Sequence, residues 1–299
     1  MPRVLPPLRS HLYAPGNNLK LLGKVHLAGA DAVIFDLEDA VPTNEKARAR
    51  GLVAEAVRAR AGQPGPAVFV RINHPSIGLA EEDIRAVVQP GLSGLRIPKV
   101  EDADTVRRVS SWVAQAEESA GVPAGSTVLV CIIESAAGVF RAYEIGAADP
   151  RVLALTYGAA DLERDLDLRP GLDDLETLYV RSQLVLASRV AGVRPPIDTV
   201  FRRLDDVDGL GRSTRRNQAL GFFGKSAIHP KQVATINAIY SPSEAEVAHA
   251  RAVISAAEVA AAQGSGALKL DSGEFVDEAV VQRARDILRL IEQSAHPTG

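Results

Sequence analysis

Two acidic residues, Glu134 and Asp161, each lie at the end of a short run of mostly apolar residues. Glu134 follows VLVCII within 128–135, and Asp161 ends VLALTYGAAD at 152–161. Runs that are apolar throughout are typical of strands in parallel α/β sheets, because such strands are buried on both faces. The two carboxylates should therefore lie on the same rim, at the carboxyl ends of successive strands. A pair of hard oxygen ligands placed there can hold Mg²⁺ and leave coordination positions open for a substrate.

Other polar side chains follow further apolar runs and should join that rim. Arg71, in VRINHP, carries a planar guanidinium that can clamp a carboxylate or stabilise an enolate oxygen. Any one such residue could be a solvated loop charge or a structural ion pair, but charges of both signs on one rim favour a functional site. The candidates are Asp36, Glu38, Asp39, Arg71, Asn73, Lys99, Glu134, Asp161 and Lys225.

The segment FDLEDAV contributes three of these acids, Asp36, Glu38 and Asp39. They would either take part in the chemistry or form a second layer that holds Arg71 or Lys99. Lys99 could instead form a Schiff base, as a strand-end lysine does in metal-free aldolases, but the neighbouring metal pair disfavours that role.

Several other catalytic machineries are absent from the sequence. The six histidines form no HExxH motif, and there is no P-loop, GxSxG or CxxC. The single Cys131 excludes an internal disulfide and lies in a predicted buried strand, where we expect a structural thiol. His229, in AIHP, is expected to cap or pack beneath the last predicted strand.

Apolar runs alternate with helical patterns along most of the chain. The predicted strands are 10–15, 30–40, 67–73, 94–100, 127–134, 152–158, 195–201 and 224–230. The predicted helices between them are 17–29, 44–62, 80–89, 103–121, 138–147, 173–191 and 214–222. Eight β/α units in series predict a closed parallel TIM (β/α)8 barrel, whose active site lies at the strand carboxyl ends. An open doubly wound sheet is the alternative, but no GxGxxG follows the first strand.

The barrel is expected within residues 1–230, and residues 231–299 are expected to form a C-terminal helical extension. Helices are predicted at 241–264 and 278–293, with a flexible hairpin-like segment at 264–277. A barrel closes without these helices, so their apolar faces should dock on its outside or on a neighbouring subunit.

Bulk composition limits the class of protein. The chain has 299 residues, 46% hydrophobic and 24% charged, which suits one large α/β barrel. Its formal net charge of −3 gives no electrostatic footprint for nucleic acid or an anionic membrane. The N-terminus has no signal-peptide core, and no apolar run approaches the ~20 residues that a membrane span needs. A cytoplasmic protein is expected.

Seven segments, in order, resemble the citrate lyase beta-subunit-like family of the HpcH/HpaI aldolase and malyl-CoA lyase superfamily. They are RSHLYAPG, FDLEDAV, VRIN, RIPKVE, CIIESAAGV, YGAADLERDL and GKSAIHP. The resemblance runs from about Arg9 to Pro230, and GEFVDEAVVQRA is similar to the family's tail. Each motif is weak alone, but seven in the right order and spacing are specific.

The resemblance implies a TIM barrel, usually trimeric, with Mg²⁺ bound by Glu134 and Asp161 and substrate bound by Arg71 and Glu134. It also implies that the tail crosses to the next subunit and supplies Asp277 as a catalytic residue. The implied reaction is reversible carbon–carbon bond chemistry between a 2-oxo acid and the enolate of a thioester. The thioester would be carried by CoA or an acyl carrier protein.

We therefore expect a Mg²⁺-dependent carbon–carbon lyase acting on citryl-CoA, malyl-CoA, citramalyl-CoA or a similar 3-hydroxy dicarboxylic acyl thioester. Its products would be a 2-oxo acid such as oxaloacetate and an acetyl thioester. A class II metal-dependent aldolase for free 2-oxo acids remains an alternative, and would differ in not binding CoA. A non-catalytic acyl-thioester-binding protein is the other alternative, which the intact set of Arg71, Glu134, Asp161 and Asp277 disfavours.

Overall fold

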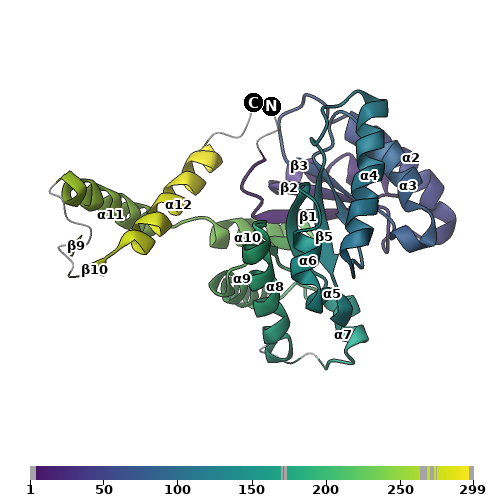
Figure 1. Cartoon of the computed structure of the whole chain (residues 1–299). Helices are drawn as coiled ribbons and strands as arrows, with labels where there is room; N and C mark the ends of the chain where they lie inside the picture. Colours follow the sequence, from purple (N-terminus) through teal and green to yellow (C-terminus); the bar gives the residue numbers. More distant parts are fainter. Residues whose placement is uncertain are drawn as a thin grey trace. The chain divides into compact units, whose positions relative to one another are not determined.

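The chain folds into two compact units, Met1–Ala238 and Ile239–Gly299. A computed structural model describes residues 5–169, 171, 174–262, 268–269, 273 and 275–295. The first unit holds a barrel of strands surrounded by helices, and the second holds a pair of helices with a small hairpin (Figure 1). Among the described residues, no helix is both long enough and apolar enough to cross a membrane.

The first unit is built on eight parallel strands whose spatial order is β7-β6-β5-β4-β3-β2-β1-β8. A parallel bridge between Asp198 and Lys225 joins the two edges of this sheet, so the sheet closes on itself. The predicted TIM barrel is therefore confirmed. The strands are β1 (Ser10–Pro15), β2 (Ala32–Asp36), β3 (Ala67–Arg71), β4 (Gly94–Ile97), β5 (Val128–Ile133), β6 (Val152–Tyr157), β7 (Arg194–Ile197) and β8 (Lys225–Ala227).

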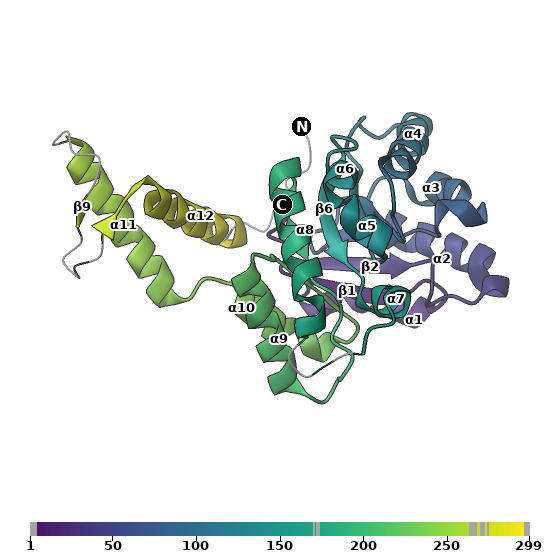
Figure 2. The ribbon, with the colours of Figure 1, turned by 60° about the horizontal axis from the view of Figure 1, so that its bottom comes forward.

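Helices lie around the outside of these strands in both ribbon views (Figures 1 and 2). They are α1 (Leu19–Leu22), α2 (Lys46–Arg58), α3 (Ala80–Val87), α4 (Ala103–Ala120), α5 (Ala136–Phe140), α6 (Ala142–Gly146), α7 (Ala159–Asp165), α8 (Leu178–Ala191), α9 (Val207–Leu220) and α10 (Val233–Tyr240). Helix α4 shows how local sequence sets such bounds. Asp102 accepts the N–H of Thr105 at 2.6 Å as an N-cap, and Gly121 ends the helix with a left-handed φ of 64°.

Alternation along the strands decides which side chains reach the barrel interior. Successive strand residues point to opposite faces, so every second residue is internal. Ile34 of β2 and Phe69 of β3 belong to one fully buried apolar cluster. Asp36 and Arg71 are the next members of the same two inward series, at the carboxyl ends of their strands. The apolar core thus ends in a polar layer at one end of the barrel.

The second unit contains a helix pair with its own apolar core. Val253 of one helix packs with Val281 and Ala284 of the other and with Val276 of the hairpin. Part of the apolar face of each of these two helices is thus buried inside the second unit. Of the hairpin-like segment predicted at 264–277, residues 264–267, 270–272 and 274 lie outside the described residues. The elements are α11 (Glu244–Ala262), β9 (Leu268–Lys269), β10 (Phe275–Val276) and α12 (Glu278–Ala295).

Several predicted helices differ from the observed ones. The segment 17–29 forms only α1 and a 3₁₀ turn at Val25–Ala28. Of the helix predicted at 173–191, Asp173 lies outside the described residues, and α8 itself begins at Leu178. Helix α9 begins at Val207 rather than at 214, because Asp206 accepts the N–H of Gly209 at 2.7 Å and caps it. Helices α7 and α10 were not predicted.

Candidate active site

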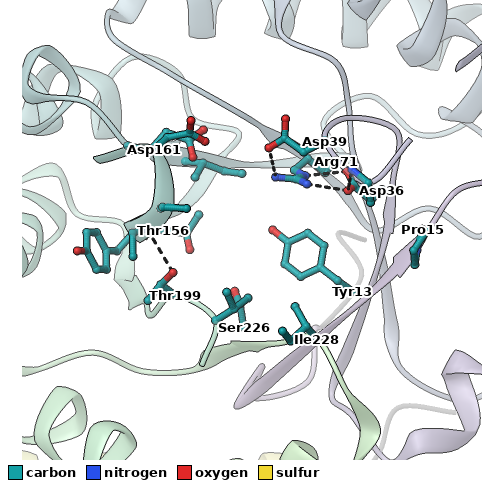
Figure 3. A pocket seen from close by; sticks show the side chains of 18 residues that line it. Tyr13, Pro15, Asp36, Asp39, Arg71, Thr156, Asp161, Thr199, Ser226 and Ile228 are labelled. Atoms are coloured by element: carbon teal, nitrogen blue, oxygen red, sulfur yellow. Dashed lines mark hydrogen bonds and ion pairs between the residues drawn. The ribbon is translucent and has the colours of Figure 1, made fainter. Parts of the chain in front are cut away.

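A cavity of about 300 Å³ opens at the carboxyl ends of the barrel strands (Figure 3). Every strand except β4 contributes to its wall, either directly or through the segment that follows it. The lining includes Tyr13, Asp36, Arg71, Glu134, Asp161 and Ser226. The strand ends therefore bring Arg71, Glu134 and Asp161 to one cavity, although they are far apart in the sequence.

Arg71 is held at the cavity wall by the three acids of FDLEDAV. Its Nε and Nη2 donate to the two carboxylate oxygens of Asp36 at 2.7 and 2.6 Å, which makes a two-pronged pair. Its Nη1 lies 2.8 Å from Oε2 of Glu38 and 3.7 Å from Oδ2 of Asp39. These contacts fix the plane of the guanidinium. Because a guanidinium carries five N–H groups, some remain for a substrate.

Charge pairing keeps both groups ionised, although Asp36 is buried and Arg71 is only partly exposed. Burial would raise the pKa of Asp36, but the charge and hydrogen bonds of Arg71 outweigh it and lower that pKa. The N–H groups of Glu38 and Ala40 add hydrogen bonds to Asp36 at 2.9 and 3.1 Å. Burial likewise opposes the charge of Arg71, but Asp36 raises the pKa of Arg71 well above its ordinary value. The cavity therefore presents a permanent, oriented cation.

Lys99 connects the FDLEDAV acids to Glu134. Its Nζ donates to Oε1 of Glu38 at 2.5 Å and lies 3.9 Å from Oδ2 of Asp161. Its backbone N–H donates to Oε1 of Glu134 at 2.7 Å, from a residue with a left-handed φ of 51°. That conformation is uncommon outside glycine, so the backbone is strained where it orients Glu134.

The protonation of Lys99 bears on its suggested Schiff-base role. Burial lowers the pKa of Lys99, but the hydrogen bond and charge of Glu38 outweigh it, so the pKa is raised. A Schiff-base lysine needs a free amine, which usually comes from a lowered pKa. The structure therefore argues against that role for Lys99.

Glu134 and Asp161 are the residues of this cavity whose carboxylates could hold a divalent cation. Glu134 is only 6% exposed, and burial raises its pKa to about 7, with the negative charges of Glu38 and Asp161 adding to this. Gly158 leaves room beside it, because a Cβ there would lie 2.5 Å from Oε2 of Glu134. Hard oxygens, mutual repulsion and free space together fit Mg²⁺. Within the described part of the chain, no three His, Cys, Asp or Glu side chains are grouped to hold a metal.

Other candidates from the sequence lie away from this cavity. Lys225 is completely buried in an ion pair with Asp198, and does not line the cavity. Asn73 is also buried, and its backbone N and Nδ2 both donate to Oδ2 of Asp83, at 3.0 and 2.7 Å. Asn73 follows β3 as predicted, but Lys225 is the first residue of β8, so the prediction that it lies at a strand carboxyl end is wrong. The partners of both residues are structural.

Three further expectations concern single residues. Asp277 precedes α12 in the second unit and accepts the N–H of Val280 at 3.1 Å, as an N-cap does. His229 caps a 3₁₀ turn, since its Nδ1 accepts the N–H of Lys231 at 3.2 Å. Cys131 is fully buried, which raises the pKa of its thiol to about 12 and confirms a structural thiol.

Sequence reasoning missed the neutral polar residues of the cavity. Tyr13, Thr156, Thr199 and Ser226 all line it. None carries a charge, and both Tyr13 and Ser226 lie within strands rather than after them. Period-two alternation could have placed Tyr13 inside the barrel, but nothing local shows that β8 lies beside β1.

Comparison with known proteins gives relatives along almost the whole chain. The family model described as HpcH/HpaI aldolase/citrate lyase matches residues 9–230. The citrate lyase subunit beta of Leuconostoc mesenteroides subsp. cremoris is 38% identical over 282 residues, which cover 94% of this chain and 92% of that protein. The L-malyl-CoA/beta-methylmalyl-CoA lyase of Cereibacter sphaeroides is 34% identical over 306 residues, which cover 96% of this chain and 95% of that protein.

A solved structure extends the similarity to the fold. It is that of CitE from Mycobacterium tuberculosis in complex with magnesium, acetoacetate and coenzyme A. It is 28% identical, has a TM-score of 0.75, and the match covers 98% of this chain and 100% of that one. The similarity therefore spans the barrel and the C-terminal unit.

Proposed function

Because the chain belongs to the HpcH/HpaI aldolase/citrate lyase family, we propose that it is a Mg²⁺-dependent carbon–carbon lyase for a 3-hydroxy dicarboxylic acyl thioester. Citryl-CoA, malyl-CoA and citramalyl-CoA are the candidate substrates. The products would be a 2-oxo acid and an acetyl thioester. The observation that carries this proposal is the convergence of Arg71, Glu134 and Asp161 on one cavity at the strand carboxyl ends.

Glu134 and Asp161 are the residues that would hold the cation. Oε1 of Glu134 accepts the N–H of Lys99, which leaves Oε2 on the side kept open by Gly158. When bound, Mg²⁺ supplies a Lewis acid that polarises the keto group of a 2-oxo acid. The relative CitE was solved with magnesium, which supports the same ion here.

Arg71 stabilises the charge that develops during cleavage. The substrate hydroxyl loses its proton to a base, and its carbon becomes the keto carbon of the 2-oxo acid. The bond to the neighbouring α-carbon breaks, and its electron pair moves into the thioester carbonyl to form an enolate. Arg71, fixed by Asp36, can place N–H groups beside that oxyanion.

Asp277 completes the cycle by giving a proton to the enolate carbon, which yields the acetyl thioester. We assign this role to Asp277 of a neighbouring subunit in a homo-oligomer, most simply a trimer. The support is the similarity of GEFVDEAVVQRA to the family's tail. Asp277 is also exposed and precedes a helix of a separate compact unit. An exposed carboxyl group can exchange protons with a substrate from outside the barrel.

The test is an assay of the purified protein with the three acyl-CoA substrates and measurement of the 2-oxo acid released. Release that needs Mg²⁺, stops with a chelator and is lost in Glu134→Gln is the expected result. Calorimetry with acetyl-CoA distinguishes the alternatives. Cleavage of free 2-oxo acid adducts without CoA binding would establish an aldolase instead, and thioester binding without turnover would establish a non-catalytic binding protein.

A further inference from the structure

Arg96 of β4 is a buried arginine inside the barrel without an acidic partner. It is 1% exposed, and within the described residues no carboxylate forms an ion pair with it. Its Nε and Nη2 have no hydrogen-bond partner there. A buried cation without a counter-charge is costly, so its position needs an explanation other than stability.

The side chain of Arg96 crosses the barrel interior to β1 and β8. Its Nη1 donates to Oη of Tyr13 at 3.1 Å and to Oγ of Ser226 at 3.3 Å. The two hydroxyls come from neighbouring strands, because Ser226 pairs in register with His11 of β1. Two guanidinium groups also lie close to the Tyr13 ring, with Cζ of Arg96 and of Arg71 5.5 and 5.2 Å from its centroid.

These contacts determine where the hydroxyl hydrogens can go. A guanidinium has donors and no acceptor, so both hydroxyl oxygens act as acceptors toward Arg96. Their own hydrogens must point elsewhere, and among the described residues neither hydroxyl donates to a protein acceptor. Tyr13 and Ser226 both line the cavity, and Figure 3 shows the Tyr13 hydroxyl directed into it. Two O–H donors therefore face the cavity beside an unneutralised cation.

We propose that Tyr13 and Ser226, oriented by Arg96, form a subsite for the second carboxylate of a dicarboxylic 2-oxo acid. The inference rests on the proposed function, in which Glu134 and Asp161 serve the other end of the same acid. The two hydroxyls donate to the carboxylate, and the charge of Arg96 behind them offsets its negative charge. The methyl group of pyruvate or the hydrogen of glyoxylate would leave both donors without a partner, which is unfavourable in a buried site.

This subsite makes the chain selective for oxaloacetate, and hence for a citryl-type thioester. The test is calorimetry of oxaloacetate, pyruvate and glyoxylate with Mg²⁺ present, on the full-length protein. Tyr13→Phe removes one oxygen and keeps the ring. It should weaken oxaloacetate binding about 10- to 100-fold, the usual effect of losing a hydrogen bond to a charged group, and leave pyruvate binding within about twofold.

Matched variants distinguish loss of the subsite from the effect of removing a hydroxyl group elsewhere in the protein. Ser226→Ala should act like Tyr13→Phe, whereas Tyr143→Phe, on α6 and 50% exposed, should change neither affinity. Arg96→Met keeps the length of the side chain and removes the donors, so it should also lower the ratio of oxaloacetate to pyruvate affinity. Combined with Tyr13→Phe its effect should be less than additive, because Arg96 acts through that hydroxyl.

The outcomes are distinct. Equal weakening of oxaloacetate and pyruvate in Tyr13→Phe, or no weakening of either, would overturn the subsite while Mg²⁺-dependent binding preserved the proposed function. Failure of the wild-type protein to bind any of the three acids with Mg²⁺ would overturn both. Should Arg96→Met fail to fold, Tyr13→Phe and Ser226→Ala decide the matter alone.

Discussion

Asp36 and Arg71 lie directly opposite one another on neighbouring strands β2 and β3, and each oxygen of Asp36 accepts one N–H of Arg71. The register of two core strands therefore sets the position of the cation. Its placement does not depend on a loop, so the guanidinium is oriented before a substrate arrives. Preorganisation of this kind is what makes a charged group effective against a developing oxyanion.

Arg71→Lys should separate charge from geometry at this position. Lysine keeps the positive charge but has no planar fork to pair with Asp36 and a second anion together. Turnover should fall at least about 100-fold, comparable to the loss of one oxyanion donor, with the fold intact by circular dichroism. A lysine variant with nearly wild-type turnover would show that Arg71 is structural.

Asp36→Asn should destabilise the protein, because it removes the carboxylate that accepts two hydrogen bonds from Arg71 and leaves only Glu38 and Asp39 to balance that cation. We expect a loss of about 3 kcal/mol in the free energy of unfolding at pH 7, measured with urea. Since pairing lowers the pKa of Asp36 below its ordinary 3.8, the wild-type advantage should persist down to about that pH and fade only below it. Asp104→Asn, in an exposed pair with Arg107, is the matched control and should change stability little. An Asp36→Asn protein as stable as that control would show that pairing with Arg71 does not stabilise the fold.

The affinity for Mg²⁺ should depend on pH through Glu134. Burial and the nearby acids raise its pKa to about 7 in the metal-free protein, so below that value a proton occupies the ligand that the ion needs. Affinity should fall up to about tenfold per pH unit below 7 and level off above it. Calorimetry in buffers of different ionisation enthalpy should detect about one proton released per ion at pH 6 and almost none at pH 8. A flat affinity across this range would remove Glu134 from the site.

Gly158→Ala should damage the same site by crowding. The φ of −103° at Gly158 suits any residue, so the added methyl acts through its contact with Glu134 rather than through the backbone. We expect Mg²⁺ to bind at least about tenfold more weakly, because Oε2 must move. Gly51→Ala in helix α2 meets no atom within 4 Å and should instead stabilise the protein by about 1 kcal/mol with unchanged Mg²⁺ affinity. Equal Mg²⁺ affinity in both variants would refute this account of Gly158.

Asp277→Asn should tell capping from catalysis in the C-terminal unit. Asparagine caps a helix as well as aspartate, so a residue that only accepts the N–H of Val280 would tolerate the change. An amide cannot exchange the proton, so a catalytic Asp277 predicts that turnover collapses at unchanged stability.

Sharing of Asp277 between subunits has its own test. Verified mixed oligomers of Asp277→Asn and Arg71→Ala subunits should regain part of the activity, because some sites then combine an intact barrel with an intact tail. No recovery in such oligomers would rule out sharing. Full activity of Asp277→Asn alone would rule out the catalytic role.

The barrel could be predicted from sequence because its strands are buried on both faces. β5 and β6 are apolar almost throughout, which leaves little ambiguity about a parallel sheet. The start of α9 was harder to predict from sequence, because Gly209 and Gly211 lower the helix propensity of its first turns. Both glycines are buried in the folded chain, so tertiary packing outweighs local preference there.

The charged part of the site could also be predicted, whereas its neutral part could not. A carboxylate such as Glu134 stands out after an apolar run, because burial of a lone charge is unfavourable. Tyr13 and Ser226 give no such contrast. Their shared partner, Arg96, lies within β4, and only closure of the barrel brings the three together. Local sequence does not record which strands become neighbours.

Three backbone hydrogen bonds among the described residues join the β7 side of the barrel to the β8 side; one runs from the N–H of Phe223 to the carbonyl of Pro196 at 3.1 Å, and the other two involve Asp198. Asp198 donates its N–H to Gly224 and accepts the N–H of Ser226, both at 2.9 Å, while its side chain pairs with buried Lys225. β2 and β3, by contrast, share a continuous five-residue register. Under thermal or mechanical stress the barrel should open first between β7 and β8, so the amide hydrogens of Asp198 and of β8 should exchange with solvent before those of β2 and β3. Neutralising Lys225 would then not simply lower the melting temperature; it would broaden the transition, because one side of the cylinder would come apart while the other remained folded.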